Sequence, residues 1–183
     1  MDSVFQKKDY SSGDGMLTKI WGPSLWHVLH TMSFNYPIKP TTEQKHEYAN
    51  FIYSLGDVLP CKYCRINLPN NMKKVPFKKS TLRSRESFSK WVYDLHNEVN
   101  KMLGKPTDLT YEEVRERYEH FRARCSAPTK KKAVKKQVGG VKETGCVVPL
   151  YGVKAKCVLR VVPEKDKCET FAVNPKCRKK RHF

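Results

Sequence analysis

The chain has no apolar run that approaches the roughly 18–20 residues needed to span a membrane. Its first residues, MDSVFQKKDYSSGDG, lack the apolar segment of a secretory signal peptide. Both absences lead us to expect an intracellular protein with no membrane span. Disulfide scaffolds are typical of secreted chains, so the seven cysteines need another explanation, and their odd number leaves at least one thiol unpaired or bonded outside the chain.

Acidic residues are scarce: 18 Asp and Glu stand against 36 Lys and Arg, a formal net charge of +18. The imbalance is concentrated in residues 126–183, which hold 16 basic and 4 acidic side chains, whereas residues 1–125 hold 20 and 14. Such a basic tail predicts an acidic partner, such as nucleic acid, an anionic surface or an acidic protein. A tail that only keeps the protein in solution is the alternative.

No strand-like alternation of any length occurs before residue 140, whereas apolar residues recur at helical spacing through residues 17–125. The pattern predicts an all-α fold, a compact bundle of four or five short helices. The expected helices are WGPSLWHVLHTMSFNYP with Pro23 in its first turn, TTEQKHEYANFIYSLGDVLP with a capping box at Thr41 and Gln44, a helix from the dicysteine onward after Pro60, SRESFSKWVYDLHNEVNKMLGKP, and YEEVRERYEHFRARC.

The composition changes after the expected bundle. We expect four segments: an N-terminal tail over residues 1–16, the helical domain over 17–125, a basic linker over 126–143 and a basic, cysteine-rich extension over 144–183. In the extension Cys146, Cys157, Cys168 and Cys177 follow one another at intervals of 11, 11 and 9 residues. This even spacing in a Val-rich segment favours a small β unit stapled by disulfides over an electron shuttle, with Cys125 as the odd thiol.

Cys61 and Cys64, in VLPCKYCRINLP, are the one close pair of cysteines. A structural zinc site needs four ligands, and the absence of a second close pair disfavours zinc. The pair lies at an expected helix start, where the helix dipole, Lys62 and Arg65 stabilise a thiolate. A dithiol there can exchange with disulfides and carry two electrons, but passing them efficiently to oxygen requires a cofactor.

Two expected helices carry side chains suited to a flat aromatic ligand with a polar rim. A histidine and an asparagine share one face of the fourth helix with apolar residues, and two tryptophans and a histidine lie in the first. A core histidine bonded to a carbonyl is the alternative for any single one of them. The residues are Trp21, Trp26 and His30 in the first helix, and His96, Val99, Asn100 and Leu103 in the fourth.

The motifs WGPSLWHVLH, LPCKYC and WVYDLHNEVNKMLGKP, in this order and spacing, closely resemble the Erv/ALR family of FAD-dependent sulfhydryl oxidases over roughly residues 17–125. The resemblance implies a four-helix bundle with a short fifth helix that holds FAD, usually as a homodimer. It implies that Cys61 exchanges with incoming dithiols and that Cys64 passes electrons to the flavin. The implied cofactor contacts are Trp21, Gly22, Pro23, Trp26, His30, His96, Asn97, Val99, Asn100, Leu103, Lys105, Arg117 and Tyr118.

The resemblance implies an enzyme that forms disulfides in protein dithiols, with O2 as acceptor and H2O2 as product. The alternative is a redox-inert structural or nucleic-acid-binding module, such as a virion component, that uses the basic tail. A thioredoxin-like reductase is disfavoured, because it needs a βαβ context around the dicysteine.

Many family members carry a second disulfide at the positions of Tyr93 and Thr110, so both cysteines are absent together here. The resemblance associates this absence with oxidases of large DNA viruses, which favours the host cytoplasm or the virion over the mitochondrial intermembrane space. For the homodimer we expect Phe51, Ile52 and Leu55 at the interface; the alternative is that these residues fill the monomer core.

Overall fold

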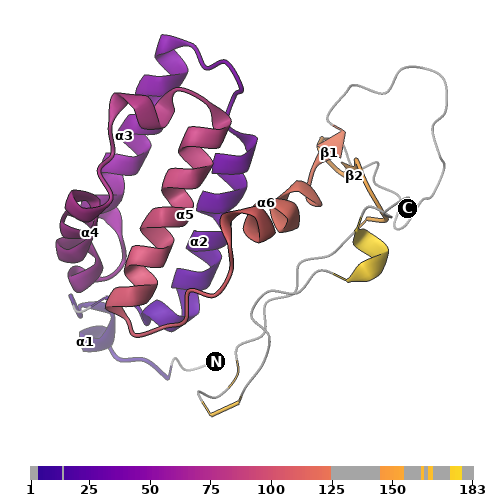
Figure 1. Cartoon of the computed structure of the whole chain (residues 1–183). Helices are drawn as coiled ribbons and strands as arrows, with labels where there is room; N and C mark the ends of the chain where they lie inside the picture. Colours follow the sequence, from indigo (N-terminus) through magenta and orange to yellow (C-terminus); the bar gives the residue numbers. More distant parts are fainter. Residues whose placement is uncertain are drawn as a thin grey trace. The chain divides into compact units, whose positions relative to one another are not determined.

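The computed structural model of the chain describes residues 4–13, 15–124, 145–154, 162, 165–166 and 174–178. It divides into two units, Met1–Tyr111 and Glu112–Phe183. In the first unit, α2 packs against α5, α3 against α4, and α4 against α5, which forms the bundle seen in Figure 1. The helices of this unit are α1 (Lys7–Tyr10), α2 (Thr18–Asn35), α3 (Thr42–Val58), α4 (Lys62–Lys74), the short η1 (Lys79–Leu82) and α5 (Arg85–Met102).

The core of the first unit lies where these helices meet. Phe88 on α5 is 2% exposed, and its ring lies 5.0 Å from that of Tyr36, which follows α2. The Tyr36 hydroxyl donates to the Leu82 carbonyl at 2.9 Å, so its one polar atom is paired inside the core. The prediction of an all-α bundle is confirmed. The buried apolar cluster comprises Leu29, Tyr36, Ile52, Leu55, Leu59, Leu68, Leu82, Phe88, Trp91, Val92 and Leu95.

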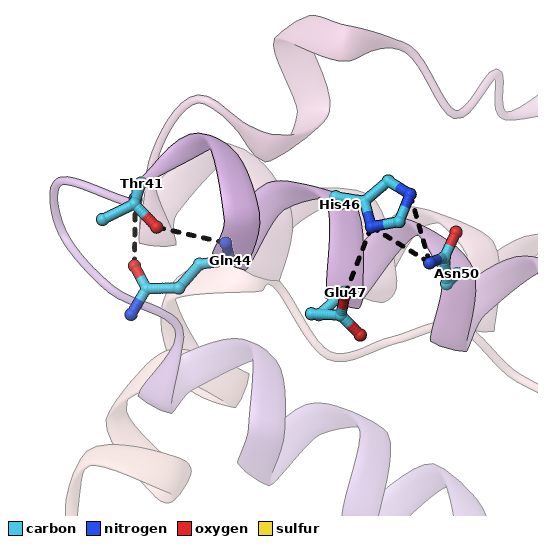
Figure 2. Close-up of polar contacts among 5 residues, drawn as sticks. All are labelled: Thr41, Gln44, His46, Glu47 and Asn50. Atoms are coloured by element: carbon cyan, nitrogen blue, oxygen red, sulfur yellow. Dashed lines mark hydrogen bonds and ion pairs between the residues drawn. The ribbon is translucent and has the colours of Figure 1, made fainter.

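Helix α3 begins with the capping box that the sequence predicts (Figure 2). The Gln44 N–H donates to Thr41 Oγ1 at 3.1 Å, and the Thr41 N–H donates to Gln44 Oε1 at 3.0 Å. These reciprocal bonds pair backbone donors that a helix otherwise leaves open at its start. The predicted end of α5 is also confirmed, because Gly104 follows it with φ at +64°.

Helix α2 begins earlier than predicted. Its first residue is Thr18, so Pro23 lies in its second turn and not in its first. Pro23 cannot donate to the carbonyl four residues before it, and the extra turn forms in spite of that loss. The preceding backbone is held from outside the helix, because the Met16 N–H donates to the Pro60 carbonyl at 2.8 Å.

The expected interface stripe on α3 is largely wrong. Ile52 is 2% exposed and Leu55 is 8% exposed, and both belong to the buried cluster. Phe51 is partly buried and packs against the same cluster. Two of the three residues therefore fill the monomer core and cannot also form a surface for a second copy.

The second unit contains most of α6 (Tyr111–Glu119), the strands β1 (Ala123–Arg124) and β2 (Val148–Pro149), and the short helix η2 (Pro175–Cys177). The predicted last helix was too long, because the chain leaves the helix after Glu119 and forms β1 instead. The two strands are antiparallel, with Ala123 opposite Pro149.

Two of the predicted tail cysteines are described: Cys146 is disulfide-bonded, and Cys177 is a free thiol. Cys125, Cys157, Cys168 and the whole of the predicted linker lie outside the described residues. In the part of the chain that is described, no helix has the length and apolar character required to cross a membrane.

Candidate redox and cofactor site

The dicysteine lies at the start of α4, as predicted. Cys61 is the N-cap, with extended backbone, and its Sγ accepts a hydrogen bond from the Cys64 N–H at 3.3 Å. Both cysteines are half-buried free thiols. No group of three or more His, Cys, Asp or Glu side chains that could hold a metal ion occurs among the residues described. The pair is therefore placed as a dithiol at the positive end of a helix.

The two thiols differ in acidity. The pKa of Cys61 is lowered, first by the hydrogen bond with the Cys64 thiol and further by the backbone N–H groups of Cys64 and Tyr63. The pKa of Cys64 is raised to about 11, first by burial and then by its hydrogen bond with Cys61. The first proton of the reduced pair thus leaves Cys61, which makes Cys61 the better leaving group when a mixed disulfide on it is cleaved.

The segment before α2 also contacts the dithiol. Gly15 forms an isolated antiparallel bridge with Cys61, and Thr18 Oγ1 lies 4.0 Å from Cys64 Sγ. Gly15 and Met16 belong to the segment predicted as a tail, and none of these contacts was predicted. Nothing in the sequence pairs residues 15–18 with residues 60–64, since the two stretches share no motif and are more than forty positions apart.

The structure brings together three of the predicted aromatic residues. His30 on α2 and His96 on α5 share a hydrogen bond between Nε2 and Nδ1 at 2.9 Å. The Trp26 ring stacks on the His96 ring, with centroids 4.1 Å apart and planes 6° from parallel. His30 is 3% exposed, whereas Trp26 and His96 are half-buried, so the cluster reaches from the core toward the surface of the bundle.

Both histidines of this cluster are neutral near pH 7. The pKa of His30 is lowered to about 3, first by burial and then by the nearby His96 and His27. The pKa of His96 is lowered to about 4, first by burial and then by the positive charge of Lys105. Two neutral imidazoles satisfy this hydrogen bond, since one ring nitrogen donates and the other accepts, so the contact fits the lowered pKa values.

The other predicted contacts differ in how far they are buried. Trp21 is half-buried, and its indole N–H donates to the Met16 carbonyl at 3.1 Å. Gly22 is buried and Pro23 is exposed on α2. Asn97, Val99 and Asn100 are half-buried on α5. Leu103 and Lys105 are exposed just beyond the end of this helix. Arg117 and Tyr118 lie in α6 and belong to the second unit.

The residues of the first unit fit a dinucleotide with a flat ring. The stacked Trp26 and His96 offer an aromatic surface, and neutral imidazoles can hydrogen-bond a polar ring edge. Lys105 lies close enough to act on the pKa of His96, which places a positive charge beside this surface for a phosphate. The donor set therefore suits FAD.

Comparison with known proteins gives one consistent family. A model of the Erv1 / Alr family matches residues 23–119. A probable FAD-linked sulfhydryl oxidase of Acanthamoeba polyphaga mimivirus is 43% identical over 99 residues, which cover 54% of this chain and 68% of the relative. The FAD-linked sulfhydryl oxidase of African swine fever virus is 32% identical over 99 residues, which cover 54% of this chain and 80% of the relative.

A cellular relative and two solved structures agree. The mitochondrial FAD-linked sulfhydryl oxidase of Schizosaccharomyces pombe is 38% identical over 85 residues, which are 46% of each chain. The crystal structure of the yeast Erv1 core superposes with a TM-score of 0.51 at 26% identity, over 64% of this chain and 92% of that chain. The FAD-binding domain of Erv1 from Saccharomyces cerevisiae superposes with a TM-score of 0.51 at 29% identity, over 56% of this chain and 94% of that chain.

Proposed function

The chain belongs to the Erv1/Alr family, and from this premise we propose that it is a FAD-dependent thiol oxidase that forms disulfides in protein dithiols. The observation that carries the proposal is the dithiol at the start of α4, in the same unit as the stacked Trp26 and His96. The net reaction is 2 R–SH + O2 → R–S–S–R + H2O2.

The dithiol performs the exchange steps. With Cys61 and Cys64 joined as a disulfide, a substrate thiolate attacks Cys61 Sγ, the bond between the two cysteines breaks, and Cys64 leaves with the electron pair. A second substrate thiolate then attacks the substrate sulfur of the mixed disulfide and releases Cys61. The lowered pKa of Cys61 favours this release, because a more acidic thiol leaves faster.

The residues of the proposed cofactor site would hold and orient FAD. FAD, when bound, accepts two electrons from the reduced pair and passes them to O2. We assign Trp26 and His96 to ring stacking, the neutral His30 and His96 to hydrogen bonds at the ring edge, and Lys105 to a phosphate. The further contacts proposed for this role are Trp21, Gly22, Pro23, Asn97, Val99, Asn100, Leu103, Arg117 and Tyr118.

The proposal is tested with the purified full chain. We expect a yellow protein that holds a single FAD and consumes oxygen with a small dithiol. Cys61→Ser and Cys64→Ser should each abolish turnover of protein substrates while FAD stays bound. Cys177→Ser is the matched control, because Cys177 is a free thiol in the second unit, and it should keep full turnover. Full oxygen consumption by Cys64→Ser with dithiol substrates would contradict the role of that residue, and a colourless, inactive chain would favour the redox-inert module.

We also propose that the basic tail, residues 126–183, binds nucleic acid or an acidic assembly partner. Its 16 basic and 4 acidic residues support this proposal. The viral relatives support action in the host cytoplasm or in a virion, and so does the absence of the second cysteine pair at Tyr93 and Thr110.

A homodimer remains part of the proposal, but its interface must use residues other than Ile52 and Leu55. Exposed apolar side chains on the same helices offer a substitute, for example Val28 on α2 and Val58 on α3, which are 47% and 67% exposed. Light scattering at micromolar concentration decides between dimer and monomer.

A further inference from the structure

The segment before α2 holds the backbone of the outer cysteine. We call residues 15–18 the clasp. Gly15 lies opposite Cys61 in the isolated bridge, and the Met16 N–H donates to the Pro60 carbonyl at 2.8 Å. Gly15 has φ at +102°, and a Cβ at this position would lie 2.8 Å from the Pro60 oxygen. Only glycine allows this close approach without a shift of the backbone.

The clasp is itself held by α2. The Trp21 indole N–H donates to the Met16 carbonyl at 3.1 Å, and the Ile20 N–H donates to the Leu17 carbonyl at 3.0 Å. Trp21 packs against the core cluster of the bundle, so the clasp is tied to the rigid part of the first unit. The backbone of Thr18, the first residue of α2, is therefore held in place relative to the bundle core.

Thr18 points its hydroxyl at the inner cysteine. Its Oγ1 lies 4.0 Å from Cys64 Sγ, within the range of a hydrogen bond to sulfur. The hydroxyl is not needed to cap α2, because the N-cap is Leu17 and the cap has no side-chain hydrogen bond. The Thr18 contact thus has no evident role in the helix itself.

The Thr18 hydrogen bond lowers the pKa values of both cysteines. Burial and the neighbouring Cys61 raise the pKa of Cys64, whereas the Thr18 hydrogen bond lowers it. The same hydroxyl also helps to lower the pKa of Cys61. A hydroxyl donor stabilises a thiolate more than a thiol, so its benefit appears when the pair loses a proton.

We infer that Thr18 is a positioning residue of the dithiol, whose hydroxyl holds Cys64 Sγ at the start of α4 and stabilises the negative charge of the reduced pair. Its consequence for turnover rests on the proposed oxidase function. Its effect on the thiols does not, because that effect requires only the reduced chain.

The test compares Thr18→Val with Thr18→Ser in the full chain. Valine keeps the branched shape without a donor, and serine keeps the donor without the methyl group. The reduced proteins are alkylated with iodoacetamide across a range of pH, and modification of Cys61 and Cys64 is followed by mass spectrometry. Thr18→Val should slow alkylation near pH 7 about two- to tenfold and move the pH profile upward, as expected for loss of one hydrogen bond to a charged group. Thr18→Ser should restore the wild-type profile.

Two results would overturn the inference. One is a Thr18→Val profile identical to that of the wild type. The other is an equal change in both variants, since that would assign the effect to the shape of the side chain and not to its hydroxyl. Thr18 is exposed, so both variants should keep the wild-type circular dichroism and melting curve. The measurement needs neither FAD nor oxygen, so a chain without oxidase activity would refute the proposed function while leaving the result on Thr18 intact.

Discussion

Cysteines occur in both units of the chain, and their surroundings differ. In the first unit Cys61 and Cys64 stand at the start of a helix, with backbone N–H groups directed at the outer sulfur. In the second unit Cys146 is disulfide-bonded, and Cys177 ends a three-residue helix whose backbone packs against Gly152. The acidity of a thiol depends on the hydrogen-bond donors fixed around it. The backbone at the start of α4 is therefore as important for a redox-active pair as the spacing of the two cysteines.

The largest contrast between the units is expected on removal of residues 126–183. Turnover of a small dithiol should survive, because the dithiol and the described histidine cluster lie in the first unit. Retention on DNA at low salt should disappear, and for the full chain the affinity should fall about 10³-fold or more between roughly 50 and 200 mM salt through counterion release. Chromatography on DNA and oxygen consumption measure the two effects separately. Loss of turnover toward protein substrates alone would instead identify a tail cysteine as an electron shuttle.

Removal of a core side chain in the first unit should lower the free energy of unfolding far more than removal of an exposed side chain in the second. Phe88→Ala removes a core side chain that is 2% exposed, and it should lower the free energy of unfolding by about 3–5 kcal/mol. Val153→Ala in the second unit removes a side chain that is 55% exposed, and it should change that energy by less than about 0.5 kcal/mol. Urea unfolding followed by circular dichroism measures both. A comparable loss in the two variants would mean that the second unit contributes to the cooperative core.

The bundle could be predicted because its signals are local. Thr41 and Gln44 fix the start of α3 by a bond pattern that spans four residues, and Pro60 and Gly104 end helices by their own backbone preferences. The start of α2 could not be predicted in this way. Pro23 suggests a later start, but a hydrogen bond from Met16 to the distant Pro60 overrides that preference.

The site was predictable where residues share a face of one helix or a motif. Trp26, His30 and His96 do meet, as their helical spacing and the family resemblance suggested. Periodicity cannot say whether an apolar stripe faces the core or a second copy, and for this reason Ile52 and Leu55 were placed at an interface. Thr18 was missed because only the folded backbone brings its hydroxyl to Cys64.

The histidine pair should give the first unit a stability that depends on pH. The pKa values of His30 and His96 are lowered to about 3 and about 4, so the unfolded chain binds more protons than the folded one below the ordinary histidine pKa of about 6.5. Stability is therefore full above that pH and falls as the pH drops toward 4, by at most about 1.4 kcal/mol per pH unit for each histidine.

Urea unfolding at several pH values, with protein freed of any bound flavin, measures this dependence. A variant with both imidazoles replaced, His30→Leu with His96→Leu, should lose the corresponding part of the slope between pH 6.5 and 5. Wild-type and double-variant slopes that are identical would show that the two histidines are not held neutral by the fold.

The smallest effect concerns the end of the first unit, where Tyr93 on α5 contacts the residues that follow this helix. The Tyr93 hydroxyl donates to the Leu109 carbonyl at 2.8 Å, and its ring meets that of Tyr111 edge-on, with centroids 5.7 Å apart. The Tyr111 hydroxyl in turn shares a buried hydrogen bond with Ser89 Oγ at 2.8 Å. Hydrogen bonds and ring contacts therefore join α5 to the segment that follows it.

Tyr93→Phe tests the hydrogen bond separately from the ring contact, because it keeps the contact with Tyr111 and removes only the bond to the Leu109 carbonyl. It should lower the free energy of unfolding by about 1 kcal/mol, the usual net value of one hydrogen bond. Tyr53→Phe, at an exposed tyrosine of α3, is the matched control and should change it by less than about 0.5 kcal/mol. Hydrogen exchange gives the location: amides just before Tyr111 should exchange faster in Tyr93→Phe, while those of α3 should not. Equal exchange in both variants would mean that the end of the first unit is held by ring packing alone.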